Sequence, residues 1–301
     1  MIIDRVSVSL VAGKGGDGGA SFSRRRRIAT ADGGDGGKGG DVVFSADPNL
    51  YDLSKFRKSK RYKASNGTSG TSQRKHGKNG EDLYLYVPCG TMIRQTDDLL
   101  LADLVGAGDR VIVLSGGRGG LGNYQRGQAE AGLPGQKKDV VLDYRIPNDV
   151  AFVGFANTGR TSLVNALSGQ SYPVAAYPFT TVHCLWAVCE HRFKRFTVLD
   201  TPPVTAHDDL REAVFLKHLH RTRIIMILSD NPDEMRAQQR IIEEKIGQVD
   251  PSYRKKKFFY LYTKVDTIKG DSPAGREVPV SLQKPETIDR LIDLILKELY
   301  S

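Results

Sequence analysis

One stretch of the chain combines glycines, an arginine and a threonine in a spacing suited to holding phosphate groups. It begins at Gly154, reads GFANTGRT, and follows a short apolar segment, residues 150–153. This is the pattern of a phosphate loop, G-x-x-x-x-G-K-[ST], with arginine in place of lysine. Its glycines would let backbone N–H groups surround a β-phosphate, and a hydroxyl at its last position could bind Mg²⁺. The alternative is a strand–helix turn without a ligand. The candidate nucleotide-binding residues here are Gly154, Asn157, Thr158, Gly159, Arg160, Thr161 and Ser162.

The arginine at position 160 changes the chemistry expected of such a loop. Lysine places a compact charge between the β- and γ-phosphates, whereas the guanidinium of Arg160 is longer and planar. We therefore expect nucleotide binding with an altered geometry.

A second motif indicates guanine recognition. Thr263 and Lys264, followed by Val265 and Asp266, resemble N-K-x-D with threonine for asparagine. The carboxylate of Asp266 could accept hydrogen bonds from both N1–H and the exocyclic amine of guanine, which adenine does not offer. Ser281, with Leu282 beside it, stands after the next short strand, where a guanine loop ends. A surface Lys/Asp pair is the alternative, but the order of the motifs favours GTP or GDP.

The first half of the chain carries most of the positive charge. Residues 1–147 hold 23 Lys/Arg and 16 Asp/Glu, whereas residues 148–301 hold 21 and 19, within a total net charge of +9. Such a front half favours a polyanionic partner, because each neutralised phosphate releases counterions. A solvated basic surface is the alternative. The candidate RNA-binding cations are Arg24, Arg25, Arg26, Arg27, Lys58, Lys60, Arg61, Arg74, Lys75 and Lys78, and Tyr51, Phe56 and Tyr62 lie among them as stacking or core residues.

Glycine divides the chain into two parts, because 26 of the 32 glycines precede residue 148. They form Gly-Gly-x runs at residues 15–19, 33–40 and 116–120, and a period of three is that of the polyproline II helix. Glycine would let such helices pack closely side by side. A flexible linker is the alternative, but strand-like segments at 6–12, 41–45, 83–88 and 110–114 separate the runs. We predict a small all-β domain with polyproline II-type helices over residues 1–147.

Residues 148–301 follow a different pattern, in which apolar strands alternate with helices. We expect strands at 150–153, 182–189, 193–199, 224–228, 258–262 and 277–280, and helices at 161–168, 209–220, 232–247 and 285–300. This alternation predicts an α/β domain with a mostly parallel sheet.

The composition, 39% hydrophobic and 26% charged, is that of a globular protein. No apolar run approaches the roughly 18 residues of a membrane span, and we expect neither a membrane span nor a secretory signal. Cys89, Cys184 and Cys189 match no zinc spacing, so we expect buried free thiols.

Taken together, these motifs resemble the Obg family of GTPases over nearly the whole chain. The shared segments are residues 36–41 (GGKGGD), 87–91 (VPCGT), 116–123, the switch I-like 177–181 (YPFTT) and 215–219 (FLKHL). The resemblance implies a glycine-rich domain followed by a Ras-like P-loop G domain. It also implies Mg²⁺ held with Thr161, Thr181 and Asp200, and as partners the large-subunit ribosomal RNA, ribosomal proteins and other assembly factors.

The chain departs from the family at the second phosphate motif, D-x-x-G, which here ends in proline. Asp200 is retained, but Pro203 stands in the place of the glycine whose N–H contacts the γ-phosphate. The following loop is short. His207 is the nearby group that could orient water, and a loop histidine without a role is the alternative. We expect hydrolysis to suffer more than binding.

The resulting hypothesis is a large-subunit assembly factor with weak or lost GTP hydrolysis. An active, ribosome-stimulated GTPase switch and a non-ribosomal protein-binding regulator are the alternatives. Degenerate motifs favour the mitochondrial matrix as the location, with bacterial cytoplasm as the alternative.

Overall fold

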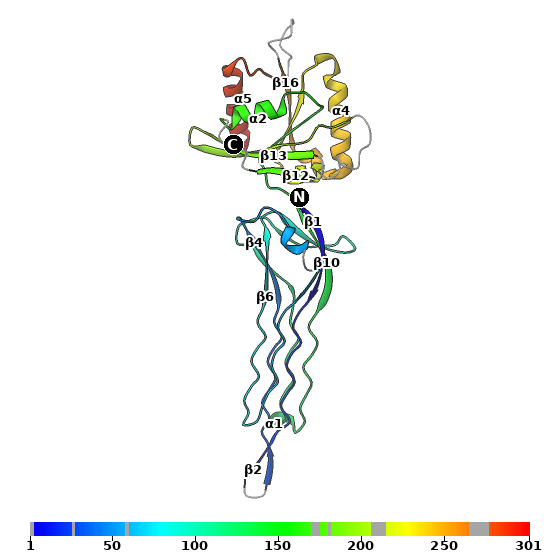
Figure 1. Cartoon of the computed structure of the whole chain (residues 1–301), viewed down its shortest axis with the longest axis vertical. Helices are drawn as coiled ribbons and strands as arrows, with labels where there is room; N and C mark the ends of the chain where they lie inside the picture. The colour runs from blue at the N-terminus through cyan, green and yellow to red at the C-terminus, as the bar shows by residue number, and fades with distance from the viewer. Residues whose placement is uncertain are drawn as a thin grey trace. The chain divides into compact units, whose positions relative to one another are not determined.

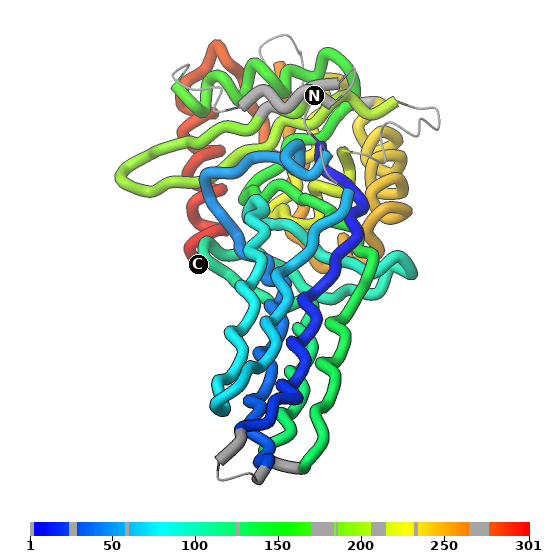
Figure 2. Tube along the Cα trace, turned by 60° about the horizontal axis from the view of Figure 1, so that its bottom comes forward, coloured from blue at the N-terminus to red at the C-terminus, as the bar shows by residue number. Residues whose placement is uncertain are grey.

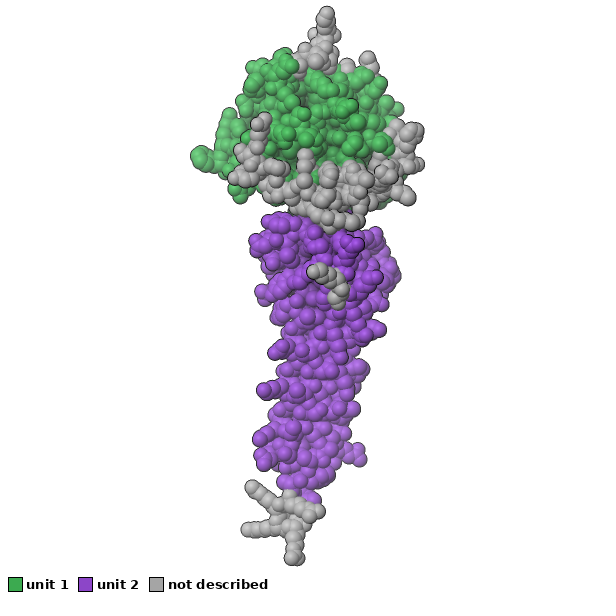
Figure 3. All heavy atoms as spheres, in the orientation of Figure 1, with its two compact units in different colours: residues 1–2, 145–301 green, residues 3–144 purple. Residues whose placement is uncertain are grey.

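The computed structural model describes residues 3–25, 28–57, 60–169, 175–179, 182–205, 215–264 and 277–301. The chain folds into two compact units (Figure 3). We call residues 3–144 the N-terminal unit and residues 145–301 the C-terminal unit.

The N-terminal unit contains the strands of a small β structure. Within the described residues they form a 5-stranded sheet of order β5-β1-β10-β7-β8, a 3-stranded sheet of order β6-β4-β9 and a 2-stranded β2-β3 hairpin. The elements are β1 (Arg5–Val11), β2 (Phe22–Arg25), β3 (Ile28–Ala31), β4 (Val42–Asp47), η1 (Ser54–Arg57), β5 (Arg61–Lys63), β6 (Leu83–Pro88), β7 (Thr91–Gln95), β8 (Leu100–Leu104), β9 (Arg110–Leu114), α1 (Asn123–Arg126) and β10 (Lys137–Tyr144).

Apolar side chains from both sheets and from η1 form the core of this β structure. Leu10 and Leu142 are fully buried on the paired strands β1 and β10, as is Phe44 on β4. The ring of Phe56 is 2% exposed and contacts the rings of Phe44 and Tyr62. Two of the three aromatics that the sequence places among the cations, Phe56 and Tyr62, therefore pack against the core, whereas Tyr51 is exposed.

Glycine-rich segments extend from this β structure and run side by side (Figures 1 and 2). Their backbone is extended, but the segments do not form β-strands. Each bonds to its neighbours through backbone groups. Gly16 N donates to Gly37 O at 2.8 Å, Gly36 N to Gly120 O at 2.8 Å, and Gly120 N to Gly16 O at 2.9 Å. A Cβ at position 36 would lie 1.9 Å from the Gly16 carbonyl oxygen, so this spacing admits only glycine. The predicted polyproline II-type bundle on an all-β domain is confirmed.

Aspartates of the glycine runs fasten the segments to one another. Carboxylates of Asp17, Asp35 and Asp41 accept hydrogen bonds from the backbone N–H groups of Gly132, Gly122 and Gly116, at 2.8, 2.7 and 2.7 Å. Each aspartate occupies the third position of the Gly-Gly-x period, where a side chain can reach a neighbouring segment. The period therefore supplies both close backbone contact and polar cross-links.

The C-terminal unit is built on a 7-stranded sheet, counted over the described residues, in the order β12-β13-β14-β11-β15-β16-β17. Neighbouring strands from β14 to β17 are parallel, and β12 and β13 add an antiparallel edge. The elements are β11 (Val150–Gly154), α2 (Arg160–Leu167), β12 (Ala175–Phe179), β13 (Val182–His191), β14 (Lys194–Asp200), η2 (Lys217–Arg221), β15 (Ile224–Ser229), α4 (Pro232–Val249), η3 (Pro251–Lys255), β16 (Lys257–Thr263), β17 (Glu277–Val280) and α5 (Pro285–Tyr300).

Helices cover this sheet on both faces, with α2 and α5 opposite α4 (Figure 1). Central strands β11 and β15 are buried along their whole length, as expected of parallel strands covered twice. Helix α5 buries Leu291 and Ile295 against Phe152 and Leu261 in one apolar cluster. The predicted α/β architecture is confirmed.

One predicted helix differs in its described part. Residues 206–214, which include half of the expected helix 209–220, lie outside the described residues. Residues 215–216 are α-helical, and the end of the expected helix forms the 3-10 helix η2. The sequence also gives no sign of the β2–β3 hairpin around Arg24 and Arg25 or of β12, whose partners are decided by the fold.

No described helix is long and apolar enough to cross a membrane. The three cysteines are free; Cys184 and Cys189 are buried as predicted, whereas Cys89 is half-buried. Burial raises the pKa of Cys189 to about 12, so its thiol stays protonated at neutral pH.

Candidate nucleotide-binding site

The carboxyl ends of the parallel strands bring the predicted nucleotide residues to one edge of the sheet. Strand β11 ends at Gly154, β14 at Asp200, β16 at Thr263, and β17 directly before Ser281. Ligands of open α/β sheets bind at this edge, because the loops that leave parallel strands meet there. The first and last of these residues, Gly154 and Ser281, are more than a hundred positions apart in the sequence. The parallel pairing of the strands brings them to the same edge.

The loop after β11 takes the backbone path that its sequence demands. Gly159 has φ +81°, a backbone conformation that favours glycine. An added Cβ would meet no atom within 4 Å, so steric room does not explain the glycine. Asn157 also adopts a positive φ of 65°, a conformation that asparagine tolerates better than most residues. Helix α2 begins directly afterwards at Arg160, with its N-terminus open toward the loop.

The guanidinium of Arg160 lies underneath this loop. Its Nη1 donates to the carbonyl oxygen of Gly154, in a short contact, and to that of Pro202 at 3.1 Å. Its Nε lies 3.7 Å from Oδ1 of Asp200, and its side chain is only 9% exposed. Arg160 therefore ties the phosphate loop to the segment that follows β14.

Asp200 and Arg160 form a buried ion pair whose charges are poorly solvated. Burial raises the pKa of Asp200, opposed by the hydrogen bond from Thr161 Oγ1 at 2.6 Å and by Arg160. Burial likewise lowers the pKa of Arg160, opposed by the charge of Asp200. Asp200 Oδ1 accepts no hydrogen bond from the described residues. A buried carboxylate oxygen of this kind fits a bound cation or an ordered water.

The backbone after Asp200 is fastened to β11. Thr201 N donates to Phe152 O at 3.1 Å, and Val204 N donates to Gly154 O at 3.0 Å. Between them Pro203 has no N–H to donate, and its side chain lines the cavity in front of the phosphate loop. The amide nearest to the missing one, that of Val204, is therefore already bonded within the protein.

The side of the site predicted to hold the base is cross-linked by polar contacts. Lys264 Nζ contacts Asp230 Oδ2 at 2.6 Å and Asn157 O at 2.9 Å, and Thr263 Oγ1 donates to Thr158 O at 2.9 Å. The sequence interpretation missed Asp230. Its signal was available, since a polar residue follows the buried strand β15 at the carboxyl edge.

The described residues form cavities along this edge. One of about 580 Å³ is lined by the phosphate loop from Ala156 to Ser162, by Pro203 and by Lys264. The second, of about 190 Å³ and largely apolar, is lined by Gly159, Ser162, Leu163, Thr263, Lys264, Val280, Leu282 and Gln283. Ser281 itself is buried, and its Oγ accepts the N–H of Gln283 at 3.1 Å. This bond lies within the loop that borders the smaller cavity, and the predicted contact of Ser281 with nucleotide stays a prediction.

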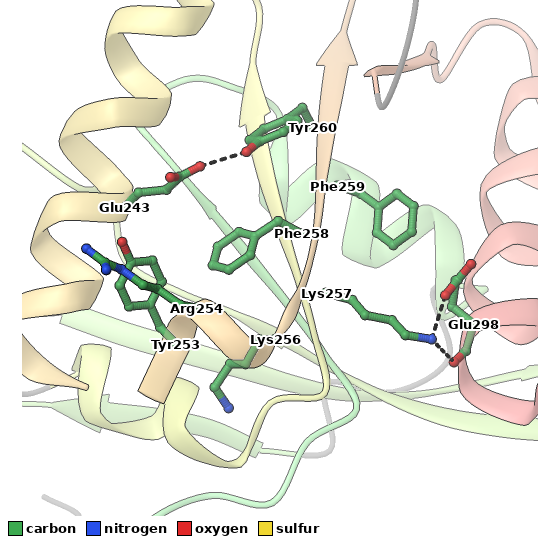
Figure 4. Close-up of a pocket in the computed structure, with 9 residues that line it drawn as sticks. All are labelled: Glu243, Tyr253, Arg254, Lys256, Lys257, Phe258, Phe259, Tyr260 and Glu298. Carbon is green, nitrogen blue, oxygen red and sulfur yellow. Dashed lines mark hydrogen bonds and ion pairs between the residues drawn. The ribbon is translucent and has the colours of Figure 1, made fainter. Parts of the chain in front are cut away.

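A further cavity, of about 690 Å³, lies elsewhere, around the opposite end of β16 (Figure 4). Its polar groups are mostly paired with one another: Tyr260 donates to Glu243, and Lys257 Nζ contacts Glu298, each at 2.7 Å. The volume alone does not make it a site, and we place the candidate site at the carboxyl edge.

The described members of the predicted RNA-binding set are spread over the N-terminal unit. Backbone N–H groups of Gln73 and Arg74 bond to Asp32, and the guanidinium of Arg74 stacks over the Tyr124 ring of α1 at 4.9 Å. This turn, α1 and the β2–β3 hairpin share the far end of the glycine bundle (Figure 1). Lys60 and Arg61 instead lie at β5, beside β1. Lys75 and Lys78 are exposed on the glycine bundle.

Several predicted residues lie outside the described part of the chain. These are Arg26, Arg27, Lys58, Thr181, His207 and Asp266, and of Arg24 and Arg25 only the strand is described.

Comparisons with known proteins match both units. The GTP1/OBG family model matches residues 3–146, and that of 50S ribosome-binding GTPases matches residues 149–264. A structure of the G domain of the T. maritima FeoB iron transporter has a TM-score of 0.41 and 22% identity, covering 51% of this chain and 99% of that one.

Curated relatives extend the match across the chain. GTPase Obg of Persephonella marina is 33% identical over 323 residues, which is 97% of this chain and 95% of that protein. GTPase Obg of Nautilia profundicola is 40% identical, covering 76% of this chain and 69% of that protein. GTPase Obg of Thermoanaerobacter sp. (strain X514) is 39% identical over 76% of this chain, which spans only 58% of that relative. With a glycine bundle fastened by aspartates in one unit and a phosphate loop at the carboxyl edge of the other, the chain belongs to the Obg family of GTPases.

Proposed function

We propose that the protein is an assembly factor of the large ribosomal subunit that docks on ribosomal RNA and hydrolyses GTP slowly or not at all. In this proposal the basic N-terminal unit provides the docking surface. The C-terminal unit holds GTP or GDP mainly as a structural element.

The observation that carries slow hydrolysis is the way the segment after Asp200 is fastened. Pro203 offers no N–H, and the N–H of Val204 is bonded to Gly154 O. Arg160 holds the same region by its bond to Pro202 O. A γ-phosphate would therefore find no backbone donor at the position from which GTPases couple hydrolysis to movement of switch II. Phosphoryl transfer depends on such placed donors, so the rate is expected to fall.

The same geometry supports retained nucleotide binding. Amides of the loop from Ala156 to Gly159 and the N-terminus of α2 border the larger cavity. Thr161 Oγ1 and the Asp200 carboxylate, 2.6 Å apart, are oxygen donors of the kind Mg²⁺ prefers, and the unbonded Oδ1 leaves an acceptor for its hydration shell. Bound Mg²⁺ would neutralise phosphate charge. In this proposal Thr181 is a further ligand of the metal, and Asp266 binds the guanine base.

Docking on RNA is supported by charge and by its placement. Residues 1–147 carry a net charge of +7, from 23 basic and 16 acidic residues. At the far end of the glycine bundle Arg74 lies over the Tyr124 ring of α1, and β3, which pairs with the strand of Arg24 and Arg25, contacts α1. The family model that matches residues 149–264 carries the description "50S ribosome-binding GTPase", which agrees with a ribosomal partner. The relatives named above are bacterial, which favours bacterial cytoplasm; the mitochondrial matrix stays a hypothesis that rests on the degenerate motifs.

The proposal is tested by phosphate release from GTP with and without purified large subunits, together with co-sedimentation in the same mixtures. We expect the protein to sediment with the subunits and to release phosphate at nearly the rate of the protein alone. Turnover strongly stimulated by the subunits would favour the active switch. Failure to sediment in moderate salt would favour the non-ribosomal regulator.

A further inference from the structure

The outer face of the β6-β4-β9 sheet carries an ordered group of exposed aromatic, apolar and basic side chains. Tyr84 and Tyr86 of β6 are 45% and 43% exposed, and Ile112 of β9 is 58% exposed. Residues two apart on a strand point to the same face, about 7 Å from one another. The two tyrosines therefore stand side by side on β6, while Leu85 between them turns into the core.

Strand register arranges these residues in two rows. In the first row Val43 of β4 lies between Tyr84 and Ile112. In the second, Ser45 lies between Tyr86 and Arg110. The central residues are small and nearly buried, at 6% for Val43 and 3% for Ser45, because larger side chains stand on both sides. Two phenol rings therefore border the small central residues on the β6 side, and Ile112 and Arg110 border them on the β9 side.

Basic groups accompany the rings. Lys55 Nζ lies over the Tyr86 ring, 5.9 Å from its centroid, and Arg110 is exposed at the other end of the same row. The acidic neighbours are engaged within their own loops: Asp47 accepts from Asn49 N, and Asp109 from Gly106 N. The face thus combines aromatic surface with cationic charge that no nearby carboxylate neutralises through a described bond.

We propose that this face, the tyrosine platform of Tyr84, Tyr86, Ile112, Lys55 and Arg110, binds unpaired RNA bases by stacking. Aromatic side chains beside cations are the usual means by which a β surface holds single-stranded nucleic acid, since every base offers a π-face and every nucleotide a phosphate. The charge of the N-terminal unit favours RNA over an apolar protein partner. The inference deepens the proposed function, because it adds a base-stacking surface at a place separate from the cations at the end of the glycine bundle.

The test measures binding of a fluorescently labelled, unstructured RNA decamer to the full chain by anisotropy. The double variant Tyr84→Ser/Tyr86→Ser should bind at least about tenfold more weakly, as expected for loss of base stacking. Tyr84→Phe/Tyr86→Phe keeps both rings and should bind within about threefold of the unchanged protein. The control is Tyr300→Ser, which removes an exposed tyrosine of the C-terminal unit and should leave affinity unchanged.

Each outcome decides the matter. Equal affinity of the serine variant and the unchanged protein, or an equal loss in the phenylalanine variant, would overturn stacking by the platform. A serine variant that keeps RNA affinity but no longer sediments with large subunits would show a protein partner instead, which also overturns it. If the chain never sediments with subunits but the decamer still depends on both tyrosines, the ribosomal proposal fails and the platform stands.

Discussion

Arg160 follows β11 and Pro203 follows β14, but both affect the backbone contacts between the phosphate loop and the segment after β14. The guanidinium bonds to the carbonyl oxygens of Gly154 and Pro202, and the amide after Pro203 bonds to Gly154 as well. Arginine can hold two carbonyls at once because its donors form a fixed fork, which a lysine ammonium lacks. The two departures from the family motifs therefore belong to one arrangement that joins the phosphate loop to the following segment.

Restoring the missing amide tests whether Pro203 slows hydrolysis, as the proposed function holds. Pro203→Gly returns an N–H at the family position, so single-turnover GTP hydrolysis with large subunits should rise at least about tenfold, given what one placed donor contributes. Pro202→Gly is the matched control: it relaxes the adjacent residue without supplying that donor, and its rate should not change. Equal rates in all three proteins would show that the amide at position 203 does not limit hydrolysis.

At the scale of elements, the glycine bundle replaces side-chain packing with backbone contact. Neighbouring segments approach until carbonyl oxygens occupy the places that Cβ atoms would take, as Gly16 O does beside Gly36. Such packing cannot adjust to an added atom, because that atom would contact backbone and not a side chain that can move.

Gly36→Ala should therefore destabilise the N-terminal unit by more than about 3 kcal/mol. Gly108→Ala is the control, since an added Cβ meets nothing within 4 Å there and only the positive φ of 83° is strained. That strain costs about 1–2 kcal/mol. Urea unfolding followed by circular dichroism compares the two. A Gly36→Ala midpoint as high as that of Gly108→Ala would contradict the close packing.

The aspartate cross-links make the bundle sensitive to acid. Burial tends to raise the pKa of Asp41, but the Gly116 N–H and the Lys38 ammonium outweigh it and hold the pKa below its ordinary 3.8. A carboxyl whose folded pKa is lowered adds stability above its unfolded pKa, and that stability is lost as pH falls through the folded value. The hydrogen bond from Lys14, with that of Gly132, lowers the pKa of Asp17 in the same direction.

The unfolding temperature of the bundle should accordingly fall as the pH drops from about 5 to about 3. Asp41→Asn loses the charge that Lys38 and Gly116 recognise, so it should be less stable at pH 7 by about 1–2 kcal/mol and show a flatter acid dependence. Asp139→Asn, at an exposed position of β10, should follow the unchanged protein. An Asp41→Asn curve parallel to that of the unchanged protein would show that this carboxylate does not govern the acid response.

At the scale of the whole molecule, positive charge is concentrated in the unit that lacks the candidate nucleotide site. The N-terminal residues 1–147 carry +7 and residues 148–301 carry +2, from the 23, 16, 21 and 19 charged residues counted above. If the N-terminal unit docks on RNA, counterion release makes binding depend steeply on salt.

Replacing Arg24, Arg25, Arg26 and Arg27 with glutamine should weaken sedimentation with large subunits. The slope of log affinity against log salt should fall by about 3, since each phosphate contact contributes about 0.7–0.9. The control replaces as many exposed cations of the C-terminal unit, Arg236, Arg240, Arg254 and Lys255. It should leave the slope unchanged, and an equal loss in both variants would mean that only net charge matters.

The amino-acid sequence by itself determined the two-part architecture, the glycine bundle and the phosphate loop after β11. These features are local: a Gly-Gly-x period, an alternation of strands and helices, and a glycine spacing before Arg160 each express their structure within a few residues. The order of the motifs also indicated which loops would meet at one sheet edge.

Only the tertiary structure decided which groups the departures touch. Three contacts show this: Arg160 donates to Pro202 O, Lys264 pairs with Asp230, and Val204 N donates to Gly154 O. Each depends on parallel strands that come together from distant parts of the chain. The exposure of Tyr84 and Tyr86 is also decided by the tertiary structure. In the sequence, tyrosine alternates with leucine along β6, which shows only that the two faces of the strand differ. Which face the core covers is decided by the partners of β6, because burial is a property of packed layers and not of a single strand.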